Sequence, residues 1–209
     1  MGGVRKPLME LAGEPVLVHA LRPFLAEPRV VAVVVALAPD DAADPPAWLT
    51  ALDPRVSVVA GGESRSDSVR LALAALPTDL AVIAVHDAAR PLVSPGVVSA
   101  CIEVALRGEG AVAGCPVVDT LKEVDSACAV VGTPDRARYW HAQTPQAFPA
   151  RMIRAAYAQP GESATDDSAL VELLGATVRM IDAGASNLKV TRPGDLAIAE
   201  AYLADSRRR

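Results

Sequence analysis

Features that mark several protein classes are scarce in this sequence of 209 residues, in which aromatic residues make up only 3%. It has three cysteines, Cys101, Cys115 and Cys128, and no two of them form a C-x-x-C pair. Neither a disulfide framework nor a zinc site is therefore expected. A reducing, cytoplasmic setting is favoured, with the cysteines used in packing.

Long apolar runs and an excess of positive charge are also missing. The longest apolar run, Val30–Ala38, is far shorter than the roughly 20 residues of a transmembrane helix, and the N-terminus has no apolar signal-peptide core. Lysine and arginine number 20 against 25 aspartates and glutamates, which gives a formal net charge of −5. We therefore expect neither a membrane nor a nucleic acid as a partner.

Three common catalytic motifs are absent as well: G-x-S-x-G, H-E-x-x-H and G-x-x-x-x-G-K-[ST]. Serine-hydrolase and P-loop ATPase functions therefore have no support. The sequence does contain 51% hydrophobic and 22% charged residues. This composition predicts a folded protein, and the length fits a single domain over residues 1–209.

Apolar blocks and helical patterns alternate along the chain. The blocks are continuous and rich in β-branched residues, as in strands that are covered on both faces. The expected strands are Val30–Val35, Val56–Ala60, Ala81–Val85, Ala111–Val118 and Thr177–Ile181. The expected helices are Pro15–Leu25, Ser66–Leu76, Ser94–Leu106, Thr165–Leu174 and Pro193–Leu203. This order predicts a three-layer α/β sandwich with a mostly parallel central sheet.

Residues 117–139 interrupt this alternation. No helical pattern occurs there, and Thr120–Val124 and Ala129–Val131 have the pattern of two short strands around Asp125–Ser126. We expect a protruding β-arm, and a second copy of the chain is the simplest partner for such an arm.

In open α/β sheets, ligands bind in the loops that follow the strands. In the loop after Val56–Ala60, two glycines would let a ligand approach the backbone, and polar side chains would lie at a helix N-terminus that favours anions. The residues concerned are Gly61, Gly62, Arg65, Ser66 and Ser68. The alternative is a tight turn with an ordinary helix cap.

The loop after Ala81–Val85 reads His86-Asp87-Ala88-Ala89-Arg90-Pro91. A carboxylate at the end of a buried strand is costly unless it is paired or binds a metal, and Mg²⁺ suits a carboxylate that is joined by phosphate oxygens. Asp87 is therefore a candidate Mg²⁺ ligand, with Arg90 able to pair with it or with a phosphate. The alternative is a purely structural ion pair.

Three further places carry polar groups. Trp140–Gln146 combines amides and a hydroxyl around a proline and could read a sugar or a base, although a polar turn is the simpler interpretation. Thr165-Asp166-Asp167 could be a binding site or only a helix cap. Lys189 lies between apolar residues and either points outward or faces an anion, and Lys6 is similar in kind.

Taken together, these segments resemble one family, the 2-C-methyl-D-erythritol 4-phosphate cytidylyltransferases, from Lys6 to about Leu203. The matching segments are Gly61-Gly62-x-x-Arg65-x-x-Ser68-Val69, His86-Asp87-Ala88-Ala89-Arg90-Pro91, Asp119-Thr120-Leu121-Lys122, Gln143-Thr144-Pro145-Gln146, Thr165-Asp166-Asp167 and Asn187-Leu188-Lys189-Val190-Thr191. The resemblance implies a Rossmann-like fold and a homodimer formed through residues 117–139. It also implies transfer of the cytidylyl group of CTP to methylerythritol 4-phosphate, with release of pyrophosphate.

The resemblance further implies roles for individual residues. Lys6 and Lys189 would be catalytic, and Asp87 would bind Mg²⁺. The nucleotide would contact Gly61, Gly62, Glu63, Arg65, Ser68 and Ala88. Methylerythritol 4-phosphate would contact Arg90, Thr120, Thr144, Thr165 and Arg136, of which Arg136 would reach across the dimer from the arm.

One part of the family pattern would lie before Met1, namely a first strand and a glycine-rich turn that ends in an arginine. Without a central strand, two neighbouring strand edges would be exposed. We therefore expect a misassigned start or an additional upstream segment, and weak activity in a protein that begins at Met1.

Two rival functions stay open. A cytidylyltransferase for another polyol phosphate, such as ribitol 5-phosphate, would share the nucleotide loops, but the contexts of Thr120 and Thr144 favour methylerythritol phosphate. A non-catalytic nucleotide-binding dimer would be consistent with the missing turn, yet it would have no need of Lys6, Asp87 and Lys189 together.

Overall fold

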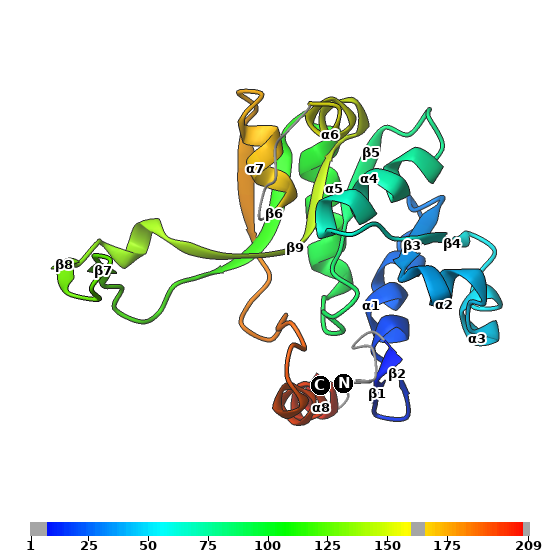
Figure 1. Ribbon diagram of the computed structural model, residues 1–209, viewed down its shortest axis with the longest axis horizontal. Coiled ribbons are helices and arrows are strands. Elements are labelled where there is room, and N and C mark those ends of the chain that lie inside the picture. Colours follow the sequence, from blue (N-terminus) through cyan, green and yellow to red (C-terminus); the bar gives the residue numbers. More distant parts are fainter. Residues whose placement is uncertain (1–7, 160–165, 207–209) are drawn as a thin grey trace.

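The computed structural model describes residues 8–159 and 166–206, which form an α/β body with one long projection (Figure 1). The helices are α1 (Val16–Leu25), α2 (Pro39–Ala43), α3 (Ala47–Thr50), α4 (Arg65–Ala75), α5 (Pro95–Leu106), α6 (Ala150–Tyr157), α7 (Asp167–Glu172) and α8 (Pro193–Ser206). The strands are β1 (Glu10–Leu11), β2 (Glu14–Pro15), β3 (Val33–Leu37), β4 (Val56–Ala60), β5 (Val82–Val85), β6 (Gly110–Pro116), β7 (Glu123–Val124), β8 (Val130–Gly132), β9 (Trp140–Pro149) and β10 (Val178–Asp182). Lys6 and Thr165 lie outside the described residues.

Among the described residues, the strands of the body form three separate sheets, of which the smallest is the antiparallel pair of β1 and β2. Four of them make the main sheet in the order β10-β6-β9-β5, and β3 and β4 form a parallel pair. Within the main sheet, β6 and β10 are parallel, whereas β9 is antiparallel to both β5 and β6. The α/β class is therefore confirmed, but the expected parallel pairing occurs only between β3 and β4 and between β6 and β10.

Strand β9 is the element that the sequence pattern conceals. The prediction of a polar turn at Trp140–Gln146 is wrong, because these residues open a ten-residue strand whose last seven residues are buried. Its polar side chains are paired inside the protein: the Nε2 of Gln146 donates to Asp166 at 3.1 Å, and its Oε1 accepts from the backbone N–H of Ser168 at 2.9 Å. Such partners replace water and allow a polar sequence to run through the middle of a sheet.

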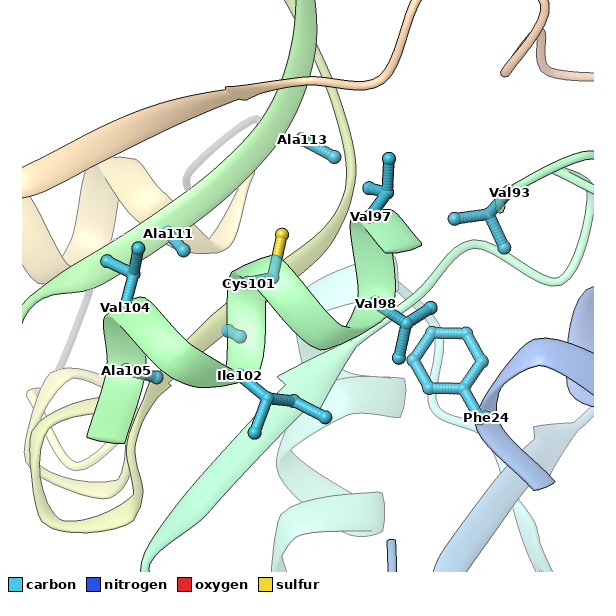
Figure 2. Packing of buried hydrophobic residues seen from close by; sticks show 11 residues of the cluster. Phe24, Val93, Val97, Val98, Cys101, Ile102, Val104, Ala105, Ala111 and Ala113 are labelled. Atoms are coloured by element: carbon cyan, nitrogen blue, oxygen red, sulfur yellow. The ribbon is translucent and has the colours of Figure 1, made fainter. Parts of the chain in front are cut away.

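Two apolar clusters cover opposite faces of the main sheet. Successive residues of a strand point to opposite faces, and on β9 Ala147 packs in one cluster while Phe148 packs in the other. The first cluster lies mainly on α5, where Phe24 of α1 lies beside Val98 (Figure 2). The second joins β5 and β9 to α4, α6 and α7. Helices therefore lie on both sides of this sheet. Cys101 is fully buried in the first cluster, which agrees with its expected packing role.

The predicted β-arm is present. Residues between β6 and β9 run out from the body, and the paired strands β7 and β8 lie at the tip (Figure 1). The arm exposes apolar side chains: Val118, Val124, Val130, Val131 and Tyr139. Cys128 is also exposed on it, so the predicted packing role is wrong for this cysteine within a single chain.

Strands β3 and β5 each have one edge without a strand partner among the described residues. β3 pairs only with β4, and β5 pairs only with β9. Both of these strands line one largely apolar cavity of about 350 Å³, which α1 and α4 also border. Two open strand edges therefore flank this cavity. In the described ranges, no helix is both long and apolar enough to cross a membrane.

Truncation of Phe148 to alanine tests the packing of β9. The ring is fully buried in the cluster that contains Ile83 and Ile153. Its loss leaves a cavity, so we expect the free energy of unfolding, measured by urea denaturation, to fall by about 3–5 kcal/mol. Leu173→Ala, outside the arm and with the side chain 64% exposed, is the control and should change it by less than about 0.5 kcal/mol. Equal losses in the two variants would contradict this assignment of the core.

Candidate active site

The candidate site is built around Asp87, which follows the carboxyl end of β5. Three cationic side chains face its carboxylate. The Nζ of Lys189 lies 2.9 Å from Oδ2, the Nε of Arg90 lies 3.5 Å from Oδ2, and the Nε of Arg65 lies 3.5 Å from Oδ1. Arg65 begins α4, Arg90 belongs to the loop after β5, and Lys189 lies between β10 and α8. Segments far apart in the sequence thus meet at one carboxylate.

The charges of these groups depend on one another. Burial opposes ionisation of Asp87 most strongly, but Lys189, Arg65 and Arg90 together outweigh it and hold the pKa of Asp87 below its usual value. Burial also lowers the pKa of Arg90 against the attraction of Asp87. Asp167 pairs with Arg65 as well, so three cations face two carboxylates and one positive charge is left over. Such a site favours an anion.

His86 links the Asp87 loop to β9. The backbone N–H of Asp87 donates to the hydroxyl of Thr144 at 3.0 Å, and the same hydroxyl lies 3.0 Å from His86 Nδ1. The Nε2 of His86 lies 3.1 Å from the carbonyl oxygen of Arg90, which can only accept. His86 therefore carries its proton on Nε2, and Thr144 donates to Nδ1. Burial lowers the pKa of His86 to about 4, so the ring is neutral near pH 7.

A second set of hydrogen bonds fastens the segment that carries Lys189. The side chain of Asn187 donates to Gln143 Oε1 at 2.8 Å and to the carbonyl oxygen of Thr144 at 2.9 Å. The carbonyl oxygen of Asn187 accepts from Arg90 at 2.9 Å. These bonds fix the backbone next to Lys189 against β9, while the Lys189 side chain itself is 43% exposed. The lysine can therefore reach a ligand bound beside Asp87.

The loop after β4 shows strong local constraints. A Cβ on Gly62 would lie 2.3 Å from the Cβ of Asp67, so the turn itself requires glycine there. The hydroxyl of Ser68 accepts from the N–H of Gly62 and donates to the carbonyl oxygen of Ser64. Ser64 caps α4, and Glu63 is exposed. These contacts support the tight-turn interpretation, and nucleotide binding by this loop stays a prediction.

The structure brings together only part of the predicted site. Arg65, Arg90, Thr144 and Lys189 contact Asp87 directly. The lining of the 350 Å³ cavity includes Arg65, Ser68, His86, Asp87 and Ala88. Thr120 and Arg136 lie on the arm, where Arg136 bonds to the carbonyl oxygen of Val118. Within a single chain they do not join the cluster.

Two residues of the site, Asp167 and Tyr157, have no assigned role in the sequence-based prediction, although Asp167 belongs to a segment that was named there as a possible binding site. Asp167 is fully buried and makes two hydrogen bonds to the Arg65 guanidinium, at 3.1 and 2.7 Å, and the hydroxyl of Tyr157 donates to it. The sequence signal was the acidic pair that begins α7. Asp166 alone is the cap, since it accepts from the N–H of Ala169 at 3.0 Å, and this leaves Asp167 free to pair elsewhere.

The chain also matches known proteins along its whole length. The family model for 2-C-methyl-D-erythritol 4-phosphate cytidylyltransferase matches residues 1–205. The chain belongs to this family. The cytidylyltransferase of that name from Acidobacterium capsulatum is 41% identical over 207 residues, which are 95% of this chain and 87% of that protein. The one from Frankia casuarinae is 45% identical over 204 residues, which are 97% of this chain and 76% of that protein.

Solved structures of cytidylyltransferases share the fold. The structure of 4-diphosphocytidyl-2C-methyl-D-erythritol synthase from Anaerococcus prevotii matches with a TM-score of 0.87 and 28% identity, over 98% of this chain and 92% of that chain. The 2-C-methyl-D-erythritol 4-phosphate cytidylyltransferase from Thermus thermophilus matches with a TM-score of 0.82 and 35% identity, over 96% of this chain and 94% of that chain. Nearly all of this chain therefore shares the fold of these two solved structures.

The donor set at Asp87 limits which metal this cytidylyltransferase could hold. The described residues contain no group of three or more His, Cys, Asp and Glu side chains placed to hold a metal ion. Mg²⁺ needs only one or two carboxylates when phosphate oxygens and water complete its shell. Asp87 therefore fits Mg²⁺ that is shared with a bound triphosphate, and it does not fit a metal held by the protein alone.

The neutral state of His86 predicts a pH dependence of stability. Its pKa is about 4 in the folded protein and 6.5 without the fold. The contribution of neutral His86 to stability is therefore fully present above pH 6.5. It is lost as the pH falls from 6.5 toward 4, because in this range the unfolded chain takes up the proton and the folded chain does not. Between about pH 7 and pH 5, we expect His86 to account for a loss of roughly 1–2 kcal/mol in the free energy of unfolding.

Urea denaturation of His86→Gln and His141→Gln at both pH values checks this. His141 is exposed, so its variant should keep the pH dependence of the original chain. His86→Gln should lose that part of it. An unchanged pH dependence in His86→Gln would show that the buried imidazole is not its source.

Proposed function

We propose that this chain transfers the cytidylyl group of CTP to 2-C-methyl-D-erythritol 4-phosphate and releases pyrophosphate. The observation that carries the proposal is the convergence of Lys189, Arg65 and Arg90 on Asp87 in a member of this family. The family assignment does not favour a ribitol 5-phosphate enzyme or a non-catalytic dimer. Both rivals are nevertheless distinguished by the assay described below.

The reaction needs positioning and charge neutralisation rather than a covalent enzyme intermediate. An oxygen of the methylerythritol phosphate forms a bond to the α-phosphorus of CTP, and the bond from that phosphorus to the leaving pyrophosphate breaks on the opposite side. Negative charge accumulates on the phosphorus oxygens and on the leaving group. Fixed cations that face this charge lower the barrier. Lys189 and Lys6 are the residues that we assign to this task.

We assign the metal to Asp87. Asp87 would hold Mg²⁺, and the chemistry that the metal would supply is screening of the phosphate charge. The side chains of Arg65 and Arg90 keep Asp87 ionised and oriented, and the Thr144 hydroxyl fixes its backbone N–H. Gly61, Gly62, Glu63, Ser68 and Ala88 are proposed to border the nucleotide.

We propose that the acceptor pocket is completed by a second protomer. Arg90 and Thr144 would contribute to it from the body, whereas Thr120 and Arg136 are on the arm. Thr165 is also proposed to bind the acceptor. The arm presents apolar side chains outward, with Val130 60% and Val131 61% exposed, and such a surface suits burial against another copy. A homodimer joined by residues 117–139 would carry Arg136 to the partner's acceptor site.

Pyrophosphate release from the purified chain tests the function directly. We expect release with CTP, Mg²⁺ and methylerythritol 4-phosphate, and none when ribitol 5-phosphate replaces the acceptor. Lys189→Ala should lower turnover by about 100-fold or more with little change in CTP affinity, because the lysine acts on charge in the transition state. Pyrophosphate release with ribitol 5-phosphate and not with methylerythritol 4-phosphate would show that ribitol 5-phosphate is the acceptor. CTP binding without pyrophosphate release would favour the non-catalytic dimer.

Mixing two inactive variants tests the arm. If Arg136 serves the partner's site, Lys189→Ala and Arg136→Ala chains combined in one dimer give one site with both changes and one site with neither. After unfolding and refolding of an equal mixture, we expect about one quarter of the activity of the original enzyme. The control is the same mixture prepared without refolding, in which subunits have not exchanged. No recovery despite confirmed mixed dimers would place Arg136 in its own chain's site.

A further inference from the structure

The guanidinium of Arg65 is shared between two carboxylates in a fixed orientation. Its two terminal nitrogens bond to Asp167, with Nη1 at 3.1 Å from Oδ1 and Nη2 at 2.7 Å from Oδ2. Only Nε is left to face Asp87, at 3.5 Å from its Oδ1. A two-pronged arginine–carboxylate pair fixes direction as well as distance. Asp167 therefore decides which edge of Arg65 is presented to the site.

Asp167 is itself held in place. Its side chain is fully buried at the start of α7, and Tyr157, the last residue of α6, donates its hydroxyl proton to Oδ1. Burial, together with the neighbouring carboxylate, raises the pKa of Tyr157, so that the hydroxyl stays protonated and continues to donate. Tyr157, Asp167 and Arg65 thus form a chain of side chains that joins α6 and α7 to the first residue of α4.

A purely structural role explains this arrangement poorly. Buried ion pairs add little to stability compared with apolar side chains of similar size, and this one lies next to the carboxylate on which the proposed chemistry depends. Arg65 lines the same cavity as Asp87 and Ala88, and it contacts Asp87 there. An arginine freed from Asp167 could turn its terminal nitrogens toward an anion bound there.

We propose that Asp167 is a positioning residue that, secured by Tyr157, clamps Arg65 so that its Nε supports Asp87 and its terminal nitrogens stay away from the bound triphosphate. The clamp keeps Arg65 from stabilising the ground state of the nucleotide, since interactions that are equally strong before and during reaction do not speed it. This inference rests on the proposed function of the site.

The clamp predicts an unusual pair of changes in Asp167→Asn. The asparagine keeps the shape of the side chain but lacks its charge, so Arg65 is released toward the nucleotide. CTP should bind about three- to tenfold more tightly in EDTA, measured by calorimetry, because a charged donor is added to the triphosphate site. Turnover in the pyrophosphate assay should fall by about tenfold, because Asp87 loses its alignment. A residue with only a structural role would weaken both binding and turnover.

Two further variants isolate the path through Arg65. In the double variant Arg65→Gln with Asp167→Asn, CTP affinity should equal that of Arg65→Gln alone, since Asp167 acts only through the arginine. Tyr157→Phe removes one hydrogen bond from the clamp and should tighten CTP binding in the same direction by a smaller factor. If Asp167→Asn does not fold, the CTP affinity of Tyr157→Phe tests the clamp in its place. Asp166→Asn, on the same helix but without contact to Arg65, is the control and should not tighten CTP binding.

The outcomes separate this inference from the proposed function. If the original chain neither binds CTP nor releases pyrophosphate, the proposed function fails and the inference falls with it. If the original chain is active but Asp167→Asn and Tyr157→Phe bind CTP more weakly, the clamp is overturned alone. Tighter binding that persists in the double variant would also overturn it, because the effect would not pass through Arg65.

Discussion

The cost of holding a carboxylate at the end of a buried strand governs the layout of this protein. Burial opposes the charge of Asp87, and Lys189, Arg65 and Arg90, which surround it, hold its pKa below the usual value. These cations come from three segments, namely the start of α4, the loop after β5 and the stretch before α8. One electrostatic requirement thus connects parts of the chain that are far apart in sequence, and it fixes where the helices and loops must meet.

A layer of neutral and paired polar groups supports the charged centre. His86 and Thr144 hold the loop of Asp87, Asn187 and Gln143 hold the segment of Lys189, and Asp167 holds Arg65. Much of this layer comes from β9, whose Gln143 and Thr144 bond to segments of the site while Ala147 and Phe148 fill the core. The strand therefore serves both packing and chemistry, which requires that each buried polar group has a partner.

The single positive charge left over in the cluster explains why the site suits a phosphate ligand. A fully neutralised cluster would have less attraction for a triphosphate, and one with fewer carboxylates would bind it so tightly in the ground state that turnover would suffer. The arm adds a second constraint. The arm extends away from the body of the same chain (Figure 1), so a complete acceptor pocket is a property of the proposed assembly rather than of one chain.

Local patterns determined much of this protein. Continuous apolar blocks identified β4, β5, β6 and β10, and the interruption of the strand–helix alternation identified the arm. Start signals identified α1, α4, α5, α7 and α8 but missed α2, α3 and α6. The order of the short motifs pointed to the family and to Asp87, Arg65 and Lys189. Only the tertiary structure decided the rest. β9 escaped prediction because its amides and hydroxyl find buried partners far away in the sequence. Asp167 looked like a cap because pairing with Arg65, 102 positions earlier, depends on packing that local sequence does not encode.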